Sequence, residues 1–292
     1  MVAYNHFIGF VPALNRSKPV SSPFSQIVTV RAHPPFEFAQ RFSHKITFLF
    51  NQGRDVALYA DKPLSPAVAG DTWGYEIEGI ALFFWTSGTR TLYYVPQKRM
   101  TEQLLEYWTL HIVLPLFFTI EETYDFLHAG AVEVEGMPIL FVAESYGGKS
   151  TMTDFFLKQG HTLVSDDKVA TYEEDGVFFG VASIPFHRPY RKLEDLGYFV
   201  DNIARTPKPI HALYELERAG ADADITIEEL HGLEKFKALR YSSEFNFSFL
   251  KPKRFAYLTR LAKAVPVYRV SVPWDMNRLP EVHQAILDHA GA

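Results

Sequence analysis

The sequence predicts a mixed α/β fold in which a phosphate-binding domain follows a β-rich N-terminal domain. The apolar run 138–142 is typical of a buried strand, and it leads through a glycine-containing loop into a short helix that Gly160 can end. Turn sequences at 135–136 (Glu-Gly) and 174–176 (Glu-Asp-Gly) separate strand-like runs and predict two hairpins near that loop. Hairpins around a single strand–loop–helix unit favour a mixed sheet over a fully parallel one.

The N-terminal part, residues 1–120, is expected to form the β-rich domain, and residues 121–292 the second domain. Strand-like runs occupy 25–31, 45–50, 55–60, 79–86 and 91–95, and residues 87–90 (Ser-Gly-Thr-Arg) are typical of a hairpin turn. Residues 101–119 are expected to be helical, with Thr101 as N-cap and an apolar face that includes Leu104 and Trp108. We expect this helix to join the two domains.

The remaining elements of the second domain are predicted from shorter patterns. Strand-like segments are expected at 162–165, 168–172, 177–181 and 265–272, and residues 207–216 lead into another. Helices are expected from Ser242 or later and over about 279–289.

Composition limits the class of protein. The chain has 292 residues, 47% of them hydrophobic, and a formal net charge of −5, which argues against a nucleic-acid-binding protein. It has no cysteine, so disulfides and cysteine-ligated metals are excluded. Residues 1–10 lack the pattern of a signal peptide, and a cytoplasmic location is expected. The apolar stretch 107–120 is shorter than the ~20 residues of a membrane span, so we expect a buried helix, with a membrane-associated helix as the alternative.

The most informative motif is the octapeptide 143–150 (Ala-Glu-Ser-Tyr-Gly-Gly-Lys-Ser), which follows G-x-x-x-x-G-K-[ST] except that Ala143 replaces the first glycine. Backbone N–H groups of such a loop and of the helix start suit a polyphosphate. Lys149 is expected to reach the β- and γ-phosphates of a nucleotide, and the Ser150 hydroxyl to bind Mg²⁺. The nucleotide-binding candidates are Glu144, Ser145, Tyr146, Gly147, Gly148, Lys149, Ser150 and Thr151. The alternative is a glycine-rich turn that binds nothing.

Two carboxylates follow the strand at 162–165. Asp166 and Asp167 come sixteen and seventeen residues after Ser150, where a returning strand would end beside the loop. One carboxylate can hold Mg²⁺, and the other can accept a proton from an attacking hydroxyl. An exposed Asp-Asp turn is the alternative. His128, fifteen residues before Ala143, can bond a phosphate or tune the base, or it is a structural hydrogen-bonding residue.

Together these motifs resemble the catalytic domain of bacterial HPr kinase/phosphorylase. The residues that carry the resemblance are 127–129 (Leu-His-Ala), the loop, 160–161 (Gly-His) and 164–167 (Val-Ser-Asp-Asp). The resemblance implies a fold related to phosphoenolpyruvate carboxykinase. It also implies that Asp166 is the catalytic base for a serine hydroxyl, that Asp167 is a metal-associated carboxylate, and that His128 lies near the phosphates. HPr kinases form hexamers, so the resemblance leaves a homo-oligomer open.

One segment departs from the family. HPr kinases carry a later E-x-R-G-x-G motif, and the corresponding segment 182–192 has none. This argues against HPr as the substrate and against phosphorolysis, and it favours relatives that phosphorylate peptides or small molecules. Arg188, Arg191 and Lys192 are candidates for contacts with phosphate or an acidic substrate, with a solvated basic surface as the alternative.

The sequence therefore predicts a kinase that uses ATP, or another nucleoside triphosphate, with Mg²⁺ to phosphorylate a hydroxyl, foremost a serine, of a protein, peptide or small molecule. Nucleic-acid binding and a membrane span are not expected. Three alternatives stay open: an ATPase or nucleotide switch, a non-catalytic relative, and an enzyme like phosphoenolpyruvate carboxykinase. The N-terminal domain is expected to recognise the substrate or to mediate assembly.

Overall fold

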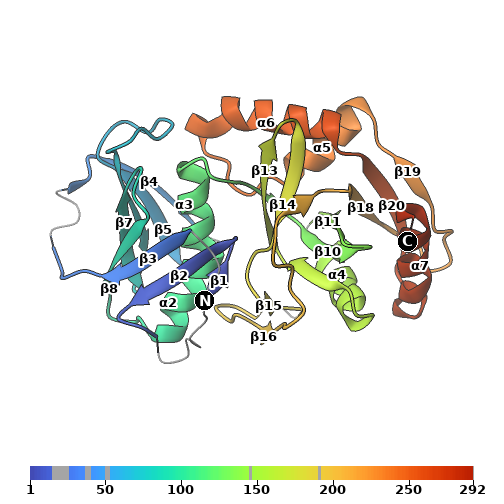
Figure 1. The fold of residues 1–292 in the computed structure, drawn as a ribbon, viewed down its shortest axis with the longest axis horizontal. Helices are drawn as coiled ribbons and strands as arrows, with labels where there is room; N and C mark the ends of the chain where they lie inside the picture. Colours follow the sequence, from blue (N-terminus) through green and yellow to red (C-terminus); the bar gives the residue numbers. More distant parts are fainter. Residues whose placement is uncertain (15–25, 37–40, 50–52, 145–146, 190–191, 292) are drawn as a thin grey trace. The chain divides into compact units, whose positions relative to one another are not determined.

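A computed structural model describes residues 1–292 except 15–25, 37–40, 50–52, 145–146, 190–191 and 292. The chain divides into two compact units (Figure 1). The first unit comprises Met1–Thr123 with Lys192–Leu196, and the second comprises Tyr124–Arg191 with Gly197–Ala292. Each unit contains a mixed sheet with helices, so the predicted mixed α/β class is confirmed.

In the described part of the first unit, eight strands form one mixed sheet. They are β1 (Val2–Ala3), β2 (His6–Val11), β3 (Ile27–Ala32), β4 (His44–Leu49), β5 (Asp55–Ala60), β6 (Thr72–Ile77), β7 (Ala81–Thr86) and β8 (Thr91–Pro96). Their order is β1-β2-β3-β8-β7-β6-β5-β4, with parallel pairs β2–β3 and β3–β8. The predicted hairpin at 87–90 is confirmed, because β7 and β8 are antiparallel neighbours.

A helical stretch crosses one face of this sheet. It consists of α2 (Glu102–Trp108), a π-helical turn η1 (Thr109–Val113) and α3 (Leu114–Ile120). The predicted N-cap is confirmed, since the Thr101 hydroxyl accepts the Leu104 N–H at 3.2 Å. The π turn lies just before Pro115, whose ring would collide with the carbonyl four residues earlier in a regular α-helix. The wider turn gives the proline room, which explains why the helix is not uniform.

The stretch Glu102–Ile120 belongs to the core of the first unit. Among the described residues it is the one helix long and apolar enough to cross a membrane, yet 78% of its most apolar window is buried in the structure. The Tyr4 hydroxyl donates to the Leu110 carbonyl at 3.0 Å, and Trp85 packs edge-on against Phe117. The predicted buried helix is therefore confirmed.

The second unit is built on a six-stranded mixed sheet with the order β12-β10-β11-β18-β20-β19. Its strands are β10 (Gly130–Val134), β11 (Met137–Val142), β12 (Thr162–Ser165), β18 (Ala212–Ala219), β19 (Ile227–Glu229) and β20 (Val267–Pro273). The strands β11, β18 and β20 are parallel, and β12 runs in their direction because both β12 and β11 are antiparallel to β10. Four strands therefore end at one edge of the sheet, where the loop and the Asp pair begin.

Helices cover both faces of this sheet. The helices are α4 (Lys149–Lys158), α5 (Gly232–Tyr241), α6 (Lys251–Ala264) and α7 (Leu279–Ala290), with short turns η2 (Ser248–Leu250) and η3 (Met276–Arg278). Side chains alternate along β11: Phe141 belongs to the same core cluster as Phe156 of α4 and Ile286 of α7, and Leu140 to the cluster that contains Leu239 of α5 and Leu258 of α6. The sheet is thus the middle layer of the unit.

Smaller sheets complete the second unit. The strands β9 (Asp125–His128), β13 (Lys168–Glu174), β14 (Val177–Val181) and β17 (Lys208–Pro209) form one sheet, and β15 (Phe186–His187) pairs with β16 (Tyr198–Phe199). Both predicted hairpins are confirmed. Their turns use left-handed residues, Glu135-Gly136 between β10 and β11 and Asp175-Gly176 between β13 and β14.

Candidate functional site

The loop at 143–148 joins β11 to α4, as the motif predicts. Gly148 has a φ of 91° directly before the helix, a conformation that favours glycine. A Cβ on Gly147 would lie 2.7 Å from the Cβ of Ala143, so no larger residue fits there. Ala143 itself is outside the left-handed region, as expected for an alanine at this position. Ser145 and Tyr146 lie outside the described residues.

Lys149 lies across this loop. Its side chain is buried, and its ammonium donates to the Ala143 carbonyl at 2.8 Å. The first hydrogen bond within α4 runs from the Met152 N–H to the Gly148 carbonyl, so the positive end of the helix dipole faces the loop. Ser150 is partly buried and Thr151 is exposed in the first turn. The arrangement concentrates positive charge and N–H donors where an anion would bind.

A close contact sets the position of α4 against the sheet. The Thr153 hydroxyl of α4 donates to the Lys149 carbonyl at 3.0 Å. A Cβ on Gly130 of β10 would lie 2.1 Å from that hydroxyl oxygen. Helix and strand therefore approach at a distance that only glycine permits, and the Lys149 carbonyl is part of the same contact.

Asp166 is the more buried member of the Asp pair, and both of its carboxylate oxygens have partners. One oxygen lies 2.6 Å from Nδ1 of His187, and the other accepts the Arg188 N–H at 3.0 Å. Asp166 is 5% exposed and His187 is fully buried. These contacts fix the orientation of the carboxylate.

His187 connects Asp166 to the helix that follows the loop. Its second ring nitrogen, Nε2, lies 3.2 Å from a carboxylate oxygen of Asp154 in α4. A carboxylate only accepts hydrogen bonds, so both contacts are made together when the ring carries an N–H on each nitrogen. The chain Asp166–His187–Asp154 thereby joins the end of β12 to the second turn of α4.

Asp154 is itself anchored by further donors. Lys158 lies 2.6 Å from one of its oxygens, and the Tyr198 hydroxyl donates to the other at 3.0 Å. Burial acts to raise the pKa of Asp154, but the hydrogen bonds from Lys158 and Tyr198 outweigh it and hold the pKa below its ordinary value. An ionised Asp154 is a good acceptor for His187.

His187 was not among the site residues predicted from the sequence. The histidine lies in the segment 182–192, where the sequence departs from the family, and its partners are 21 and 33 residues away. A strand-like Phe-His pair between two prolines was the available signal. His187 lies in β15, which pairs with β16, and the tertiary fold brings it beside Asp166.

The side chains of His128 and Arg188 both lie beside Asp167. Nδ1 of His128 is 3.3 Å from one Asp167 oxygen, and the Arg188 guanidinium is 3.5 Å from the other. His128 ends β9 and Glu244 lies 3.7 Å from the same ring nitrogen. The structure thus brings three of the predicted site residues into contact.

The two other basic candidates differ from Arg188. Arg191 lies outside the described residues. The Lys192 side chain is 82% exposed and lies 3.6 Å from Asp195, so the solvated-surface interpretation fits it.

For Mg²⁺, the available ligands are oxygens. Within the ranges that the structure describes, no three His, Cys, Asp or Glu side chains cluster closely enough to hold a metal ion. A site made from the Ser150 hydroxyl, the Asp167 carboxylate and phosphate oxygens is of a different kind, and hard oxygen donors are what Mg²⁺ prefers.

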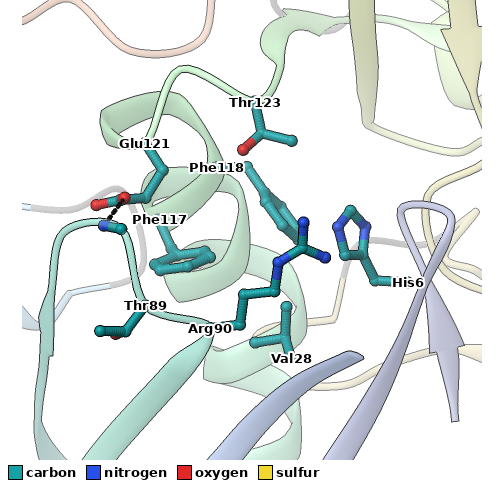
Figure 2. A pocket seen from close by; sticks show the side chains of 9 residues that line it. His6, Val28, Thr89, Arg90, Phe117, Phe118, Glu121 and Thr123 are labelled. Atoms are coloured by element: carbon teal, nitrogen blue, oxygen red, sulfur yellow. Dashed lines mark hydrogen bonds between the residues drawn. The ribbon is translucent and has the colours of Figure 1, made fainter. Parts of the chain in front are cut away.

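A separate cavity of about 190 Å³ lies in the first unit (Figure 2). It is lined by His6, Val28, Gly88, Thr89, Arg90, Phe117, Phe118, Glu121 and Thr123. The Glu121 carboxylate accepts the Gly88 N–H at 2.8 Å and so holds the 87–90 turn. Burial lowers the pKa of His6. The hydrogen bond to the Tyr4 carbonyl acts to raise this pKa, and the nearby positive charge of Arg90 acts to lower it. None of the predicted site residues lines this cavity.

Comparison with known proteins supports the motif-based resemblance. HPr kinase/phosphorylases from two strains of Clostridium botulinum are 37% identical to this chain over 83 residues, which is 28% of this chain and 26% of each relative. The predicted resemblance to HPr kinase/phosphorylase is confirmed over this stretch. The chain thus spans about a quarter of the length of the curated relatives it matches.

Two other comparisons are less informative. The structure of the Hpr(Ser) kinase/phosphatase from Coxiella burnetii matches 56% of this chain and 95% of that chain, with 14% identity and a TM-score of 0.34, a likeness too low to add to the argument. No protein-family model matches the chain.

Proposed function

We propose that this chain is an ATP- and Mg²⁺-dependent kinase of the cytoplasm that transfers the γ-phosphoryl group to a hydroxyl, with a serine as the first acceptor to test. The observation that carries the proposal is the contact chain from Asp166 through His187 to the helix behind the loop. It supports a site in which the Asp pair and the loop act together, in a chain similar to HPr kinase/phosphorylase over 83 residues.

The loop is proposed to hold the nucleotide phosphates. Gly147 and Gly148 keep the backbone open at the helix start, and the dipole of α4 favours negative charge there. The buried Lys149 ammonium donates to the Ala143 carbonyl, which keeps its positive charge at the loop where the phosphates are proposed to bind. A bound Mg²⁺, held by Ser150 and Asp167, would neutralise charge on the transferring group.

Asp166 is proposed to accept the proton of the attacking hydroxyl. A carboxylate has about four lone-pair sites, and the contacts to His187 and to the Arg188 N–H take one on each oxygen. One site on each oxygen is left for the hydroxyl.

We do not propose HPr as the acceptor, and we do not propose that the chain catalyses phosphorolysis. The segment 182–192 lacks the E-x-R-G-x-G motif, and in this chain it forms β15 and supplies His187. A peptide or small molecule bearing a hydroxyl is the better candidate. We propose that the first unit recognises this acceptor.

The proposal is tested with γ-labelled ATP, Mg²⁺ and a panel of serine peptides and small hydroxyl compounds. Labelled product is expected with the unmodified chain, and Lys149→Ala is expected to abolish it. Lys237→Ala, on the exposed side of α5, is the matched control and should leave transfer unchanged.

The outcomes separate the proposal from its rivals. Hydrolysis of ATP without labelled product across the panel would favour an ATPase or a nucleotide switch. Failure to bind Mg-ATP at all would favour a non-catalytic relative. Equal transfer by Lys149→Ala and the unmodified chain would overturn the proposed loop chemistry.

A further inference from the structure

An aromatic side chain stands at the same sheet edge as the loop. Because β11, β18 and β20 are parallel, the residues that follow them meet at one edge. Trp274 comes directly after β20. Its backbone N–H donates to the backbone carbonyl of Ala219, at the end of β18, at 3.1 Å. The main-chain bond fixes where the indole begins.

The indole of Trp274 lies against the last glycine of the loop. A Cβ on Gly148 would lie 3.8 Å from Cζ3 of the indole. The Arg218 guanidinium carbon is 3.9 Å from the centre of the ring, a cation–π contact that orients it. The ring is therefore held beside the loop by contacts from two strands.

This indole is also unusually open to solvent. Trp274 is 45% exposed, whereas Trp73, Trp85 and Trp108 are 2% exposed or less. Tryptophan is the side chain with the largest apolar surface, and an exposed one beside an anion-binding loop is characteristic of a stacking surface for a ligand.

We propose that Trp274 is the stacking surface for the base of the purine nucleotide whose phosphates the loop binds, and that Arg218 holds the indole in place. The inference rests on the proposed function, since it assigns the base end of the same nucleotide. Every base offers a π face, and stacking on an aromatic side chain contributes to affinity without fixing the base identity. The site therefore predicts only a modest preference for one nucleotide base over another.

The test compares ATP with inorganic tripolyphosphate, which has the phosphates and no base. Trp274→Ala is expected to weaken ATP binding about 5- to 150-fold and to leave tripolyphosphate binding unchanged. ATP is also expected to quench the tryptophan fluorescence of the unmodified chain, because the other three indoles are buried. Trp274→Phe should retain most of the ATP affinity and lose the quench.

Each other outcome overturns the inference in a distinguishable way. Unchanged ATP affinity in Trp274→Ala would refute the stacking role and leave the kinase proposal standing. An equal loss of ATP and tripolyphosphate binding would show that Trp274 only supports the loop. A raised KM for the phosphoryl acceptor with unchanged ATP affinity would assign the indole to the acceptor. If the unmodified chain bound neither probe, the proposed function would fail as well.

Discussion

Gly130→Ala is the substitution whose effect follows most directly from the geometry. The new Cβ would lie 2.1 Å from the Thr153 hydroxyl oxygen, and its next contacts would be at 3.5 and 3.6 Å. Gly130 has no positive φ, so the strain comes from the contact and not from the backbone. Either the hydroxyl gives up its bond to the Lys149 carbonyl or α4 moves off the sheet.

The magnitude follows from overpacking in a buried contact, which costs about 1–3 kcal/mol. For a domain of this size, each kcal/mol corresponds to roughly 2–4 °C in Tm, so we expect a drop of about 2–12 °C. Nucleotide affinity should fall too, because Lys149 belongs to the displaced turn. Differential scanning calorimetry and urea unfolding measure the first effect, and ATP titration measures the second.

A second substitution isolates the cause. Thr153→Ala removes the oxygen in question and leaves only the contacts at 3.5 and 3.6 Å. The double variant should therefore be more stable than the sum of the single effects predicts, by about 1–2 kcal/mol. Gly9→Ala on β2 is the matched control, since its Cβ would meet only one atom, at 3.7 Å. Additive effects, or a Gly130→Ala variant as stable as the unmodified chain, would show that the Thr153 hydroxyl does not exclude a larger residue at position 130.

Three further predictions follow from the contacts described above. His187→Ala should lower kcat by more than tenfold with little change in the KM for ATP, because Asp166 loses the partner that orients it. His187→Asn should recover part of the lost kcat. An equal change in kcat and in the KM for ATP would contradict this role. Burial, and then the nearby His161, lower the pKa of His283 in the folded chain. The stability that the neutral His283 contributes is therefore present above the unfolded pKa of about 6.5 and is lost as the pH falls through the lower folded pKa. The Tm should fall below about pH 6.5, and it should fall less in His283→Gln. The Glu194 carboxylate accepts a hydrogen bond from the partly buried Arg54 guanidinium at 2.7 Å and another from the Trp108 indole N–H at 2.7 Å. Glu194→Ala removes this shared acceptor and should destabilise the first unit by about 1–3 kcal/mol in urea unfolding. An unchanged unfolding midpoint would contradict a stabilising role for these two bonds.

Local signals were sufficient for the elements that the sequence predicted well. The helix capped by Thr101, the turns predicted at 135–136 and 174–176, and the strand before the loop each depend on residues close together in the chain. A cap, a left-handed turn or a short apolar run acts over one to six residues, so its pattern can be recognised without the tertiary structure.

Other elements were missed because their patterns are weak. The strands β2 and β6 each carry a glycine in mid-strand, which interrupts the alternation that identifies a strand. The helix α5 has a largely polar sequence, with Ala238 and Leu239 as its buried residues. Packing against neighbours decides these segments, and the sequence alone does not report it.

The candidate site also contains residues that a local pattern predicts and residues that only the tertiary structure reveals. The loop and the Asp pair were predicted from their spacing, and their catalytic roles stay predictions. The placement of His187 depends on β15, β16 and α4, which are distant in sequence, so no local pattern could reveal it. The assignment of Lys192–Leu196 to the first unit is likewise a tertiary property.

The most direct test of the account compares ATP binding and γ-phosphoryl transfer in Asp166→Asn. Asparagine keeps the size of the side chain and removes the basic oxygen, so we expect ATP binding within about twofold of the unmodified chain and transfer reduced by about 10²–10⁴-fold. Transfer at the unmodified rate would show that Asp166 does not accept the proton of the hydroxyl.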